Sequence, residues 1–255
     1  MFTADGNDHV AYCVWLDGIL AYEKPLPMLF CRLARSAKRV AIVGANTGLY
    51  ALVAARISST AIVEAFEPLP EAIFWLKKNV AANRLEHRIW ILEAAVGPEC
   101  GTDQLLLPPK RFGQTIETSA SLNSAVRSDS NHAIAVPVVT LDSQRHKHDC
   151  PYDVVLMDVE GYEPKVLSGA QRVIEHDQPI ILTEILEPEI ADQLEAWRRG
   201  AGYCFAAVIG EEVRHGGKVR CIHGSANHIL FPAARHDFLR VVVQESGLRW
   251  IEVNA

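Results

Sequence analysis

Short runs of apolar residues alternate with segments of helical periodicity along most of the chain after Lys38. Five apolar runs predict buried strands, namely Arg39–Val43, Ala61–Phe66, Arg88–Leu92, Tyr152–Met157 and Pro179–Thr183. Apolar residues at helical spacing predict helices between them, over Leu49–Ile57, Pro70–Asn83, Pro164–Glu175 and Pro188–Arg199. Strands and helices that alternate at this spacing are typical of a doubly wound α/β fold with a mostly parallel sheet.

Further strands and one segment without a clear period complete the expected organisation. Strands are predicted over Ala133–Thr140, Tyr203–Ile209 and, last along the chain, Asn227–Phe231. Residues 98–133 are rich in Gly, Pro, Ser, Thr and Asn, so an irregular insertion near the functional site is expected there. The sequence leaves open whether this segment covers the site or adds short strands. We expect one domain over residues 36–235, with an N-terminal leader (1–35) and a C-terminal tail (236–255) packed on it.

The composition is that of a soluble globular protein, since 49% of the 255 residues are hydrophobic and 22% are charged. The 25 Lys and Arg residues against 31 Asp and Glu give a formal net charge of −6, which argues against nucleic acid as a partner. No apolar run reaches the roughly 18 residues of a membrane span. No basic residue precedes Lys24, and the six cysteines form no C-x-x-C pair. We therefore expect a cytoplasmic enzyme or binding protein. The sequence does not determine its oligomeric state.

A glycine-containing turn follows the first predicted strand, at the end of the sheet where ligands bind in doubly wound folds. Gly44-Ala45-Asn46-Thr47-Gly48 has the G-x-x-x-G pattern, but Asn46 stands where the dinucleotide fingerprint needs its second glycine. Glu67, followed by Pro68, ends the second strand 19 residues after Gly48, at the offset of a carboxylate that binds ribose hydroxyls. Together they predict a nucleoside site. Because S-adenosylmethionine carries no phosphates, the incomplete glycine turn favours it over NAD.

The fourth strand of the alternation ends in a cluster of acidic residues. Asp158 and Glu160 follow it, and the alternation of a strand, if it continues that far, places both on one side. Glu163 is expected to cap the next helix. Glu184 ends the fifth strand, which we expect to be the neighbour of the fourth. Two acids from adjacent strand ends bind a hard divalent metal ion or act as a general base, so we predict Asp158, Glu160 and Glu184 as catalytic residues.

Several motifs, taken in order, resemble the FkbM-type methyltransferases from about residue 20 to residue 232. They are Val43–Tyr50, Phe66-Glu67-Pro68, Thr140-Leu141-Asp142, Asp158–Glu163 and Val166–Ala170. The central Asp-Val-Glu-Gly-x-Glu, followed by Val-Leu-x-Gly-Ala, is far more specific than the glycine turn. Tyr22-Glu23, Glu184 and the strand over Asn227–Phe231 also resemble the pattern of that family.

The resemblance implies a class I methyltransferase fold, a Rossmann-like doubly wound α/β architecture whose mostly parallel sheet has an antiparallel last strand. It implies S-adenosylmethionine as methyl donor and, as acceptor, a hydroxyl on a sugar, glycolipid or polyketide-type natural product. We assign the turn from Gly44 to Gly48 to the methionine part of the cofactor and Glu67 to its ribose. Ala95 and Val96 are expected to flank the adenine. The predicted catalytic acids orient or deprotonate the acceptor, directly or through a divalent ion.

Two alternatives remain open at this stage. An NAD-dependent oxidoreductase shares the glycine turn and Glu67, but the chain lacks the full fingerprint and a Tyr-x-x-x-Lys pair. A non-catalytic module that binds a nucleoside cofactor is motivated by two departures from the family pattern. Ala41 stands where an acidic residue is usual in the family, and its loss could weaken the binding of the glycine turn to the cofactor. Leu156 stands where lysine is common, so the acidic cluster lacks the charge that would have paired with it.

Overall fold

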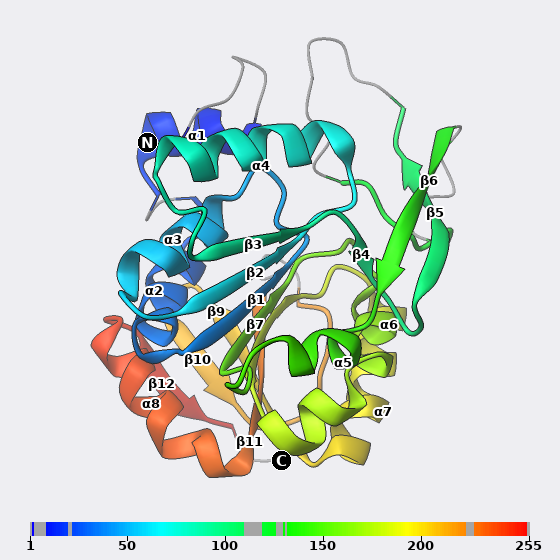
Figure 1. Ribbon diagram of the computed structural model, residues 1–255. Coiled ribbons are helices and arrows are strands. Elements are labelled where there is room, and N and C mark those ends of the chain that lie inside the picture. Colours follow the sequence, from blue (N-terminus) through cyan, green and yellow to red (C-terminus); the bar gives the residue numbers. More distant parts are fainter. Residues whose placement is uncertain are drawn as a thin grey trace.

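The computed structural model describes residues 2, 9–19, 22–109, 119–125, 130, 132–222 and 227–253. A nine-stranded sheet crosses it in the order β12-β10-β9-β11-β8-β7-β1-β2-β3 (Figure 1). Its strands are β1 (Arg39–Val43), β2 (Ile62–Phe66), β3 (Ile89–Leu92), β7 (Val154–Met157), β8 (Ile180–Glu184), β9 (Tyr203–Ile209), β10 (Glu212–His215), β11 (Asn227–Pro232) and β12 (Arg249–Glu252). The strands from β3 to β8 in this order are parallel, whereas β11 is antiparallel to both β8 and β9.

Helices cover both faces of this sheet because successive side chains of its strands point to opposite faces. On β1, Val40 and Ile42 belong to one core, and Ala41 and Val43 belong to the other. The first core packs against α2 (Leu26–Ser36), α3 (Leu49–Ile57), α4 (Pro70–Ala82) and α8 (His236–Glu245). The second packs against α5 (Leu141–Gln144), α6 (Glu163–Ser168), η2 (Val173–Asp177) and α7 (Pro188–Ala201) on the opposite side (Figure 1). The doubly wound prediction is thus confirmed.

A second sheet, of three strands, stands beside the carboxyl ends of the main one. It comprises β4 (Ala95–Val96), β5 (Gly101–Leu107) and β6 (His132–Val139), in the order β4-β6-β5. Leu105, Val136 and Val138 bury their side chains against Leu69 and Ala72 at the start of α4. The sheet closes one side of the space above β1, β2 and β7 (Figure 1). The remaining short elements are α1 (His9–Asp17), η1 (Arg145–Lys147) and η3 (Ala233–Arg235).

The helix predicted over Pro164–Glu175 is two elements, α6 and the π-helical turn η2. The chain breaks at Gly169, whose Cα lies so close to the backbone of Gly97 that a Cβ there would meet the Gly97 carbonyl oxygen at 2.0 Å. The second element has a cap of its own, because the Asp142 carboxylate accepts hydrogen bonds from the N–H groups of Arg172 and Val173, each at 3.0 Å. A tertiary contact therefore overrides the helical period.

The structure decides one expectation that the sequence left open and corrects another. Residues 98–133 are not wholly irregular, because β5 pairs with β6 along its full length, from Gly101 opposite Val138 to Leu107 opposite His132. The strand over Asn227–Phe231 is not the last, since α8 and β12 follow it and β12 pairs with β10. Leu239, Val242 and Val243 lie at helical spacing on the buried face of α8, a signal that was present in the sequence.

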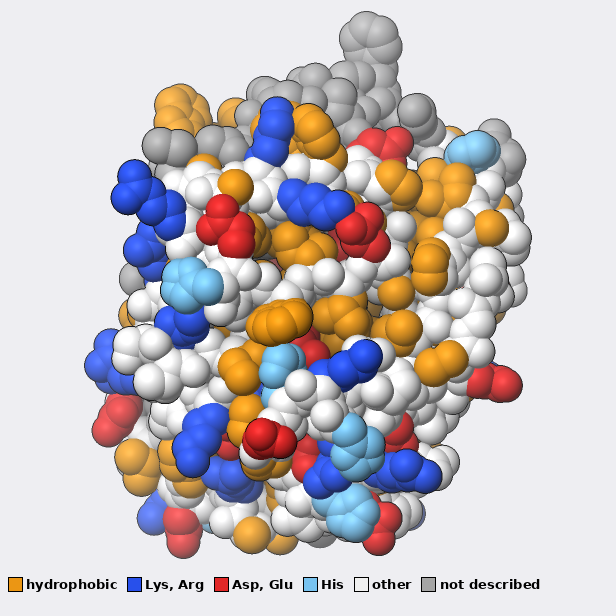
Figure 2. Space-filling view, in the orientation of Figure 1, with side chains coloured by type: hydrophobic (Ala, Val, Ile, Leu, Met, Phe, Trp, Pro, Cys, Tyr) orange, Lys and Arg blue, Asp and Glu red, His pale blue; other side chains and the backbone are white. Residues whose placement is uncertain are grey.

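The surface gives no sign of a membrane span or of a basic patch on the face seen. Among the described residues, no helix has the length and apolar character that crossing a bilayer requires. On the face in Figure 2, the Lys and Arg side chains lie among Asp and Glu side chains rather than in one continuous area. That distribution gives no support for a nucleic-acid surface there.

Candidate active site

A pocket that is partly open to solvent lies at the carboxyl ends of β1, β2 and β7. Seven of the eight predicted cofactor residues line it, namely Gly44, Ala45, Asn46, Glu67, Pro68, Ala95 and Val96. The eighth, Gly48, is not among its lining residues. It begins α3 with φ of 101°, and a Cβ there would meet Leu76 Cδ1 at 2.5 Å. Gly48 thus sets the close packing of α3 on α4 instead.

The turn after β1 is held by the end of β2. The N–H groups of Gly44 and Ala45 both donate to the carbonyl oxygen of Phe66, at 3.1 and 2.9 Å. Asn46 has φ of 48°, which asparagine tolerates better than most residues, and its side-chain oxygen accepts from the N–H of Thr47 at 2.7 Å. Thr47 Oγ1 is buried and has no hydrogen-bond partner among the described residues, and Thr47 lines the pocket. A buried hydroxyl of this kind is a ready contact for a polar ligand.

Glu67 connects this turn to the second strand. Its Oε2 accepts from the N–H of Asn46 at 2.7 Å, and its Oε1 accepts from the N–H of Leu69 at 2.9 Å. The residue is only 7% exposed. Burial raises the pKa of the Glu67 carboxyl to about 7, although the two backbone hydrogen bonds oppose the rise. Each carboxylate oxygen keeps a lone pair for a further donor, which suits a diol.

The predicted catalytic acids gather at the floor of the pocket. Asp158 and Glu160 line the pocket itself, and Glu184 lines a smaller adjoining hollow together with Asp158, Glu23 and Tyr50. As expected, β7 and β8 are neighbours, with Met157 opposite Thr183, so the residues that follow come close together. The three predicted residues therefore do lie in one cluster.

Two carboxyl groups of this cluster, those of Asp158 and Glu184, hold their protons more tightly than usual. The Asp158 side chain is open to the pocket but surrounded by protein on its other sides, and this burial raises its pKa well above the ordinary value. The charges of Glu184 and Glu160 raise it further. Burial raises the pKa of Glu184 to about 7, as does the charge of Glu160, while a hydrogen bond with Asp158 acts in the opposite direction. The pKa values of Asp158 and Glu184 are thus both raised, and the protonation of one carboxyl affects that of the other.

Asp158 and Glu160 both line the pocket, but the condition for placing them on one side of a strand is not met. Strand β7 ends at Met157, and Glu160 has φ of 52°, so the alternation of a strand does not extend to it. The turn is held instead by the segment before β6. Ser121 Oγ donates to the carbonyl oxygen of Glu160 at 2.8 Å, and Asn123 Nδ2 donates to that of Gly161 at 2.8 Å.

Two tyrosines close the site from the N-terminal side, and the sequence analysis gave them no role. Tyr50 donates its hydroxyl to Glu23 Oε2 at 2.7 Å, and Tyr22 also lines the pocket. Burial, reinforced by the charge of Glu23, raises the pKa of both phenols, so they remain donors. Both had appeared within family-like motifs, but their meeting depends on the fold.

Glu163 lies below the pocket as the first residue of α6 and is 1% exposed. Its Oε1 accepts from the N–H of Gly161 at 3.3 Å, whereas its Oε2 has no hydrogen-bond partner in the structure. Burial raises its pKa from 4.5 to about 7, although hydrogen bonds from the backbone N–H groups nearby, its own among them, oppose the rise. Ionisation of Glu163 therefore costs stability rather than adding to it.

Glu163→Gln is expected to reduce the loss of stability at high pH. The stability tied to a protonated Glu163 is complete below pH 4.5 and is lost as the pH rises through 7. Relative to the wild type, the free energy of unfolding of the variant should therefore improve by about 2–3 kcal/mol between pH 5 and pH 8. Urea unfolding at both values measures it, with the exposed Glu189→Gln as control. If the free energy of unfolding of Glu163→Gln differed from that of the wild type by the same amount at pH 5 and at pH 8, the raised pKa of Glu163 would be contradicted.

Comparison with known proteins places this site in a family. The family model for the methyltransferase FkbM domain matches residues 43–205, more than half of the chain and all of the glycine turn, Glu67 and the acidic cluster. No curated protein sequence matches the chain.

Three solved structures are among those that the chain resembles. The FkbM methyltransferase from Methylobacillus flagellatus KT is 15% identical, with 76% of this chain and 44% of that chain covered and a TM-score of 0.47. A putative O-methyltransferase from Klebsiella pneumoniae is 11% identical, with 82% and 80% covered and a TM-score of 0.48. The O-methyltransferase TomG from Streptomyces achromogenes, in complex with SAM, is 12% identical, with 81% and 78% covered and a TM-score of 0.47.

The chain spans less than half the length of the M. flagellatus protein. The architecture is the class I methyltransferase-like α/β fold that the sequence motifs implied, with a mixed, mostly parallel sheet. On the family match over residues 43–205, the chain belongs to the FkbM family of S-adenosylmethionine-dependent methyltransferases.

Proposed function

We propose that the protein transfers a methyl group from S-adenosylmethionine to a hydroxyl group on a sugar, glycolipid or polyketide-type natural product. The observation that carries this proposal is the Asp158–Glu184 pair at the floor of the pocket. A hydroxyl is a poor nucleophile until its proton is removed, and a carboxylate with a raised pKa is suited to remove it near neutral pH. The oxygen of the acceptor would then be aligned with the methyl group by the pocket walls.

The residues of the cofactor end fit S-adenosylmethionine. Glu67 would accept from the ribose hydroxyls, and the turn from Gly44 to Asn46, with the unpaired hydroxyl of Thr47, would hold the methionine part. Ala95 and Val96 are buried and apolar, as the faces of an adenine require. When bound, the cofactor supplies an electrophilic methyl group on sulfur. No set of phosphate-binding glycines accompanies Glu67, which keeps NAD as the lesser alternative.

Proton transfer at the acceptor would fall to Asp158, beside Glu184. The O–C bond would form as the bond between the methyl group and sulfur breaks, with S-adenosylhomocysteine as the leaving group. The acceptor O–H would donate to the Asp158 carboxylate, which keeps the proton, while Glu160 orients the acceptor.

Glu67→Ala is expected to lower the affinity for S-adenosylhomocysteine by about tenfold to a hundredfold, because the hydrogen bonds to a charged acceptor are lost. Calorimetric titration of the wild type, of Glu67→Ala and of the exposed control Glu86→Gln measures it, with NAD as a parallel ligand. Binding of S-adenosylhomocysteine to the wild type and the control, and its loss in Glu67→Ala, support the proposal. Binding of NAD in place of S-adenosylhomocysteine would overturn it.

A further inference from the structure

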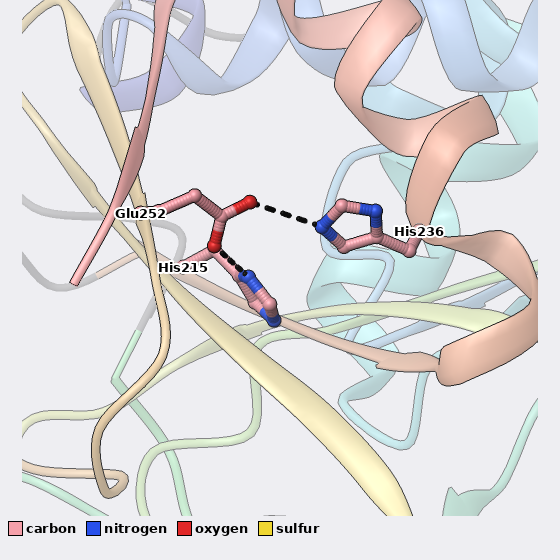
Figure 3. Close-up of side chains that lie close together, drawn as sticks. All are labelled: His215, His236 and Glu252. Carbon is pink, nitrogen blue, oxygen red and sulfur yellow. Dashed lines mark hydrogen bonds and ion pairs between the residues drawn. The ribbon is translucent and has the colours of Figure 1, made fainter. Parts of the chain in front are cut away.

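Two imidazoles and a carboxylate meet at the edge of the main sheet, well separated along the chain. His215 ends β10, His236 begins α8 and Glu252 ends β12, and the three side chains point toward one another (Figure 3). His215 Nδ1 lies 2.6 Å from Glu252 Oε2, and His236 Nε2 lies 3.2 Å from Glu252 Oε1. One ligand atom from each residue can be chosen so that all three lie within 4.8 Å of one another. Among the described residues, no other such group of His, Cys, Asp or Glu exists.

This cluster is separate from the methyltransferase pocket. Strands β1, β2 and β7 point their carboxyl ends toward the pocket. Because β9 is antiparallel to both β11 and β10, and β11 is antiparallel to β8, β10 and β12 run opposite to β8. His215 and Glu252, at the carboxyl ends of β10 and β12, therefore lie at the end of the sheet opposite to the pocket. None of the three residues lines the pocket.

We propose that His215, His236 and Glu252 form a binding site for a zinc ion. Two imidazole nitrogens and one carboxylate oxygen are a donor set that zinc accepts, in tetrahedral coordination with a fourth position for water. Calcium and magnesium prefer oxygen ligands throughout, so two imidazoles argue against them. His215, His236 and Glu252 are 19%, 30% and 57% exposed in their side chains, which leaves solvent access for the ion and its water.

Neighbouring groups orient the three ligands. His236 turns Nε2 to Glu252, while its Nδ1 lies 3.3 Å from Asp237 Oδ1. A carboxylate on the second nitrogen fixes the tautomer that leaves Nε2 free to coordinate, as outer partners of zinc-bound histidines do. The indole of Trp250 stacks on His215 at 5.3 Å between ring centroids and donates to Glu252 Oε1 at 2.7 Å. The carboxylate of Glu252 is thus held between the two imidazoles.

The position of the site assigns it a role in holding the C-terminal elements together. A single ion would link the end of β10, the start of α8 and the end of β12, and so add to the strand pairing, the apolar packing and the Arg249–Glu212 ion pair that already join these elements. Because such a site exists only in the folded chain, zinc would stabilise the folded state. Methyl transfer at the other end of the sheet would not require it.

Titration of metal-free, tag-free protein with zinc sulfate, followed by calorimetry, tests the site. The variants are His236→Gln and Glu252→Gln, with His146→Gln, an exposed histidine on η1, as matched control and Asp158→Asn as control for the pocket acids. We expect one equivalent of zinc in the wild type and both controls, and affinity at least about tenfold lower in the two site variants. X-ray absorption of the zinc-loaded wild type should show a mixed nitrogen and oxygen shell at about 2.0–2.2 Å.

Thermal unfolding gives a second readout. Zinc should raise the unfolding temperature of the wild type and of His146→Gln but not that of His236→Gln. Circular dichroism and S-adenosylhomocysteine affinity report whether each variant is folded, and both should match the wild type. If Glu252→Gln disturbs the pairing of β12, the zinc affinity of His236→Gln alone decides whether the site exists. No zinc binding by the wild type, or equal binding in His236→Gln, would overturn the proposal.

Discussion

Asp158→Asn is expected to reduce the rate of methyl transfer by about 10²–10⁴-fold, while the affinity for S-adenosylhomocysteine stays within roughly threefold of the wild type. Asparagine keeps the shape of the side chain but has no basic oxygen to take the acceptor proton. The cofactor contacts proposed for Glu67 and the glycine turn are untouched by this change. A rate effect without a binding effect is therefore the signature of a base rather than of a cofactor ligand.

Transfer of a labelled methyl group to an acceptor found by screening hydroxylated sugars, glycolipids and polyketides measures the rate. Asp149→Asn, at an exposed position, is the matched control and should retain wild-type turnover. Near-wild-type turnover in Asp158→Asn would refute the role of this residue. Loss of wild-type turnover on treatment with a chelator, restored by magnesium, would instead route the proton transfer through a divalent ion.

Leu156 bears on the same chemistry. It lines the hollow that Asp158, Glu184 and Glu23 share, at the position where lysine is common in the family. A lysine there would offset the desolvation of the carboxylates and lower their pKa values. The leucine leaves the raised values of Asp158 and Glu184 unopposed, which suits a base that works near neutral pH. Ala41, the other departure, is fully buried in the core between β1 and α5–α7 and lies outside the pocket lining.

The sequence was sufficient for those parts of the fold that depend on continuous apolar runs. Strands β1, β2, β7 and β8 are buried on both faces, so their composition alone distinguishes them. The offset of Glu67 from the glycine turn follows from the length of one strand–helix–strand unit, which is why its position in the pocket could be predicted. The nearness of Asp158 and Glu184 followed from the pairing of consecutive parallel strands.

Features that depend on contacts between distant segments could not be predicted in this way. Glu160 occupies a left-handed turn that residues 121–123 hold in place, and no local pattern signals it. The break at Gly169 arises from contact with Gly97. His215, His236 and Glu252 have no motif spacing. The parallel pairing of β12 with β10 and the packing of α8 against β12 bring them together. Contacts between segments far apart in the sequence, rather than local conformational preference, determine all three of these features.

Gly44→Ala is expected to lower the free energy of unfolding by roughly 2–5 kcal/mol and to weaken S-adenosylhomocysteine binding by about tenfold or more. Gly44 has φ of 81°, and a Cβ there would meet the backbone carbonyl oxygen of Asp158 at 2.0 Å. Backbone atoms cannot rotate away as a flexible side chain can. The turn after β1 and the turn after β7 would have to separate, which moves Asn46 relative to Glu67 and Asp158.

Gly202→Ala is the control that separates the cost of the steric overlap in Gly44→Ala from the cost of a positive φ in a residue with a Cβ. Gly202 has φ of 69° at the end of α7, but a Cβ there meets nothing within 4 Å. This control should therefore cost only about 1–2 kcal/mol, the penalty of the left-handed conformation itself. Urea unfolding of both variants, with calorimetric titration of S-adenosylhomocysteine, gives the comparison. If Gly44→Ala and Gly202→Ala lost the same free energy of unfolding, and Gly44→Ala still bound S-adenosylhomocysteine as tightly as the wild type, the turns after β1 and β7 would be free to separate. The close approach of β1 to Asp158 would then not be what aligns the cofactor end of the pocket with its acidic floor.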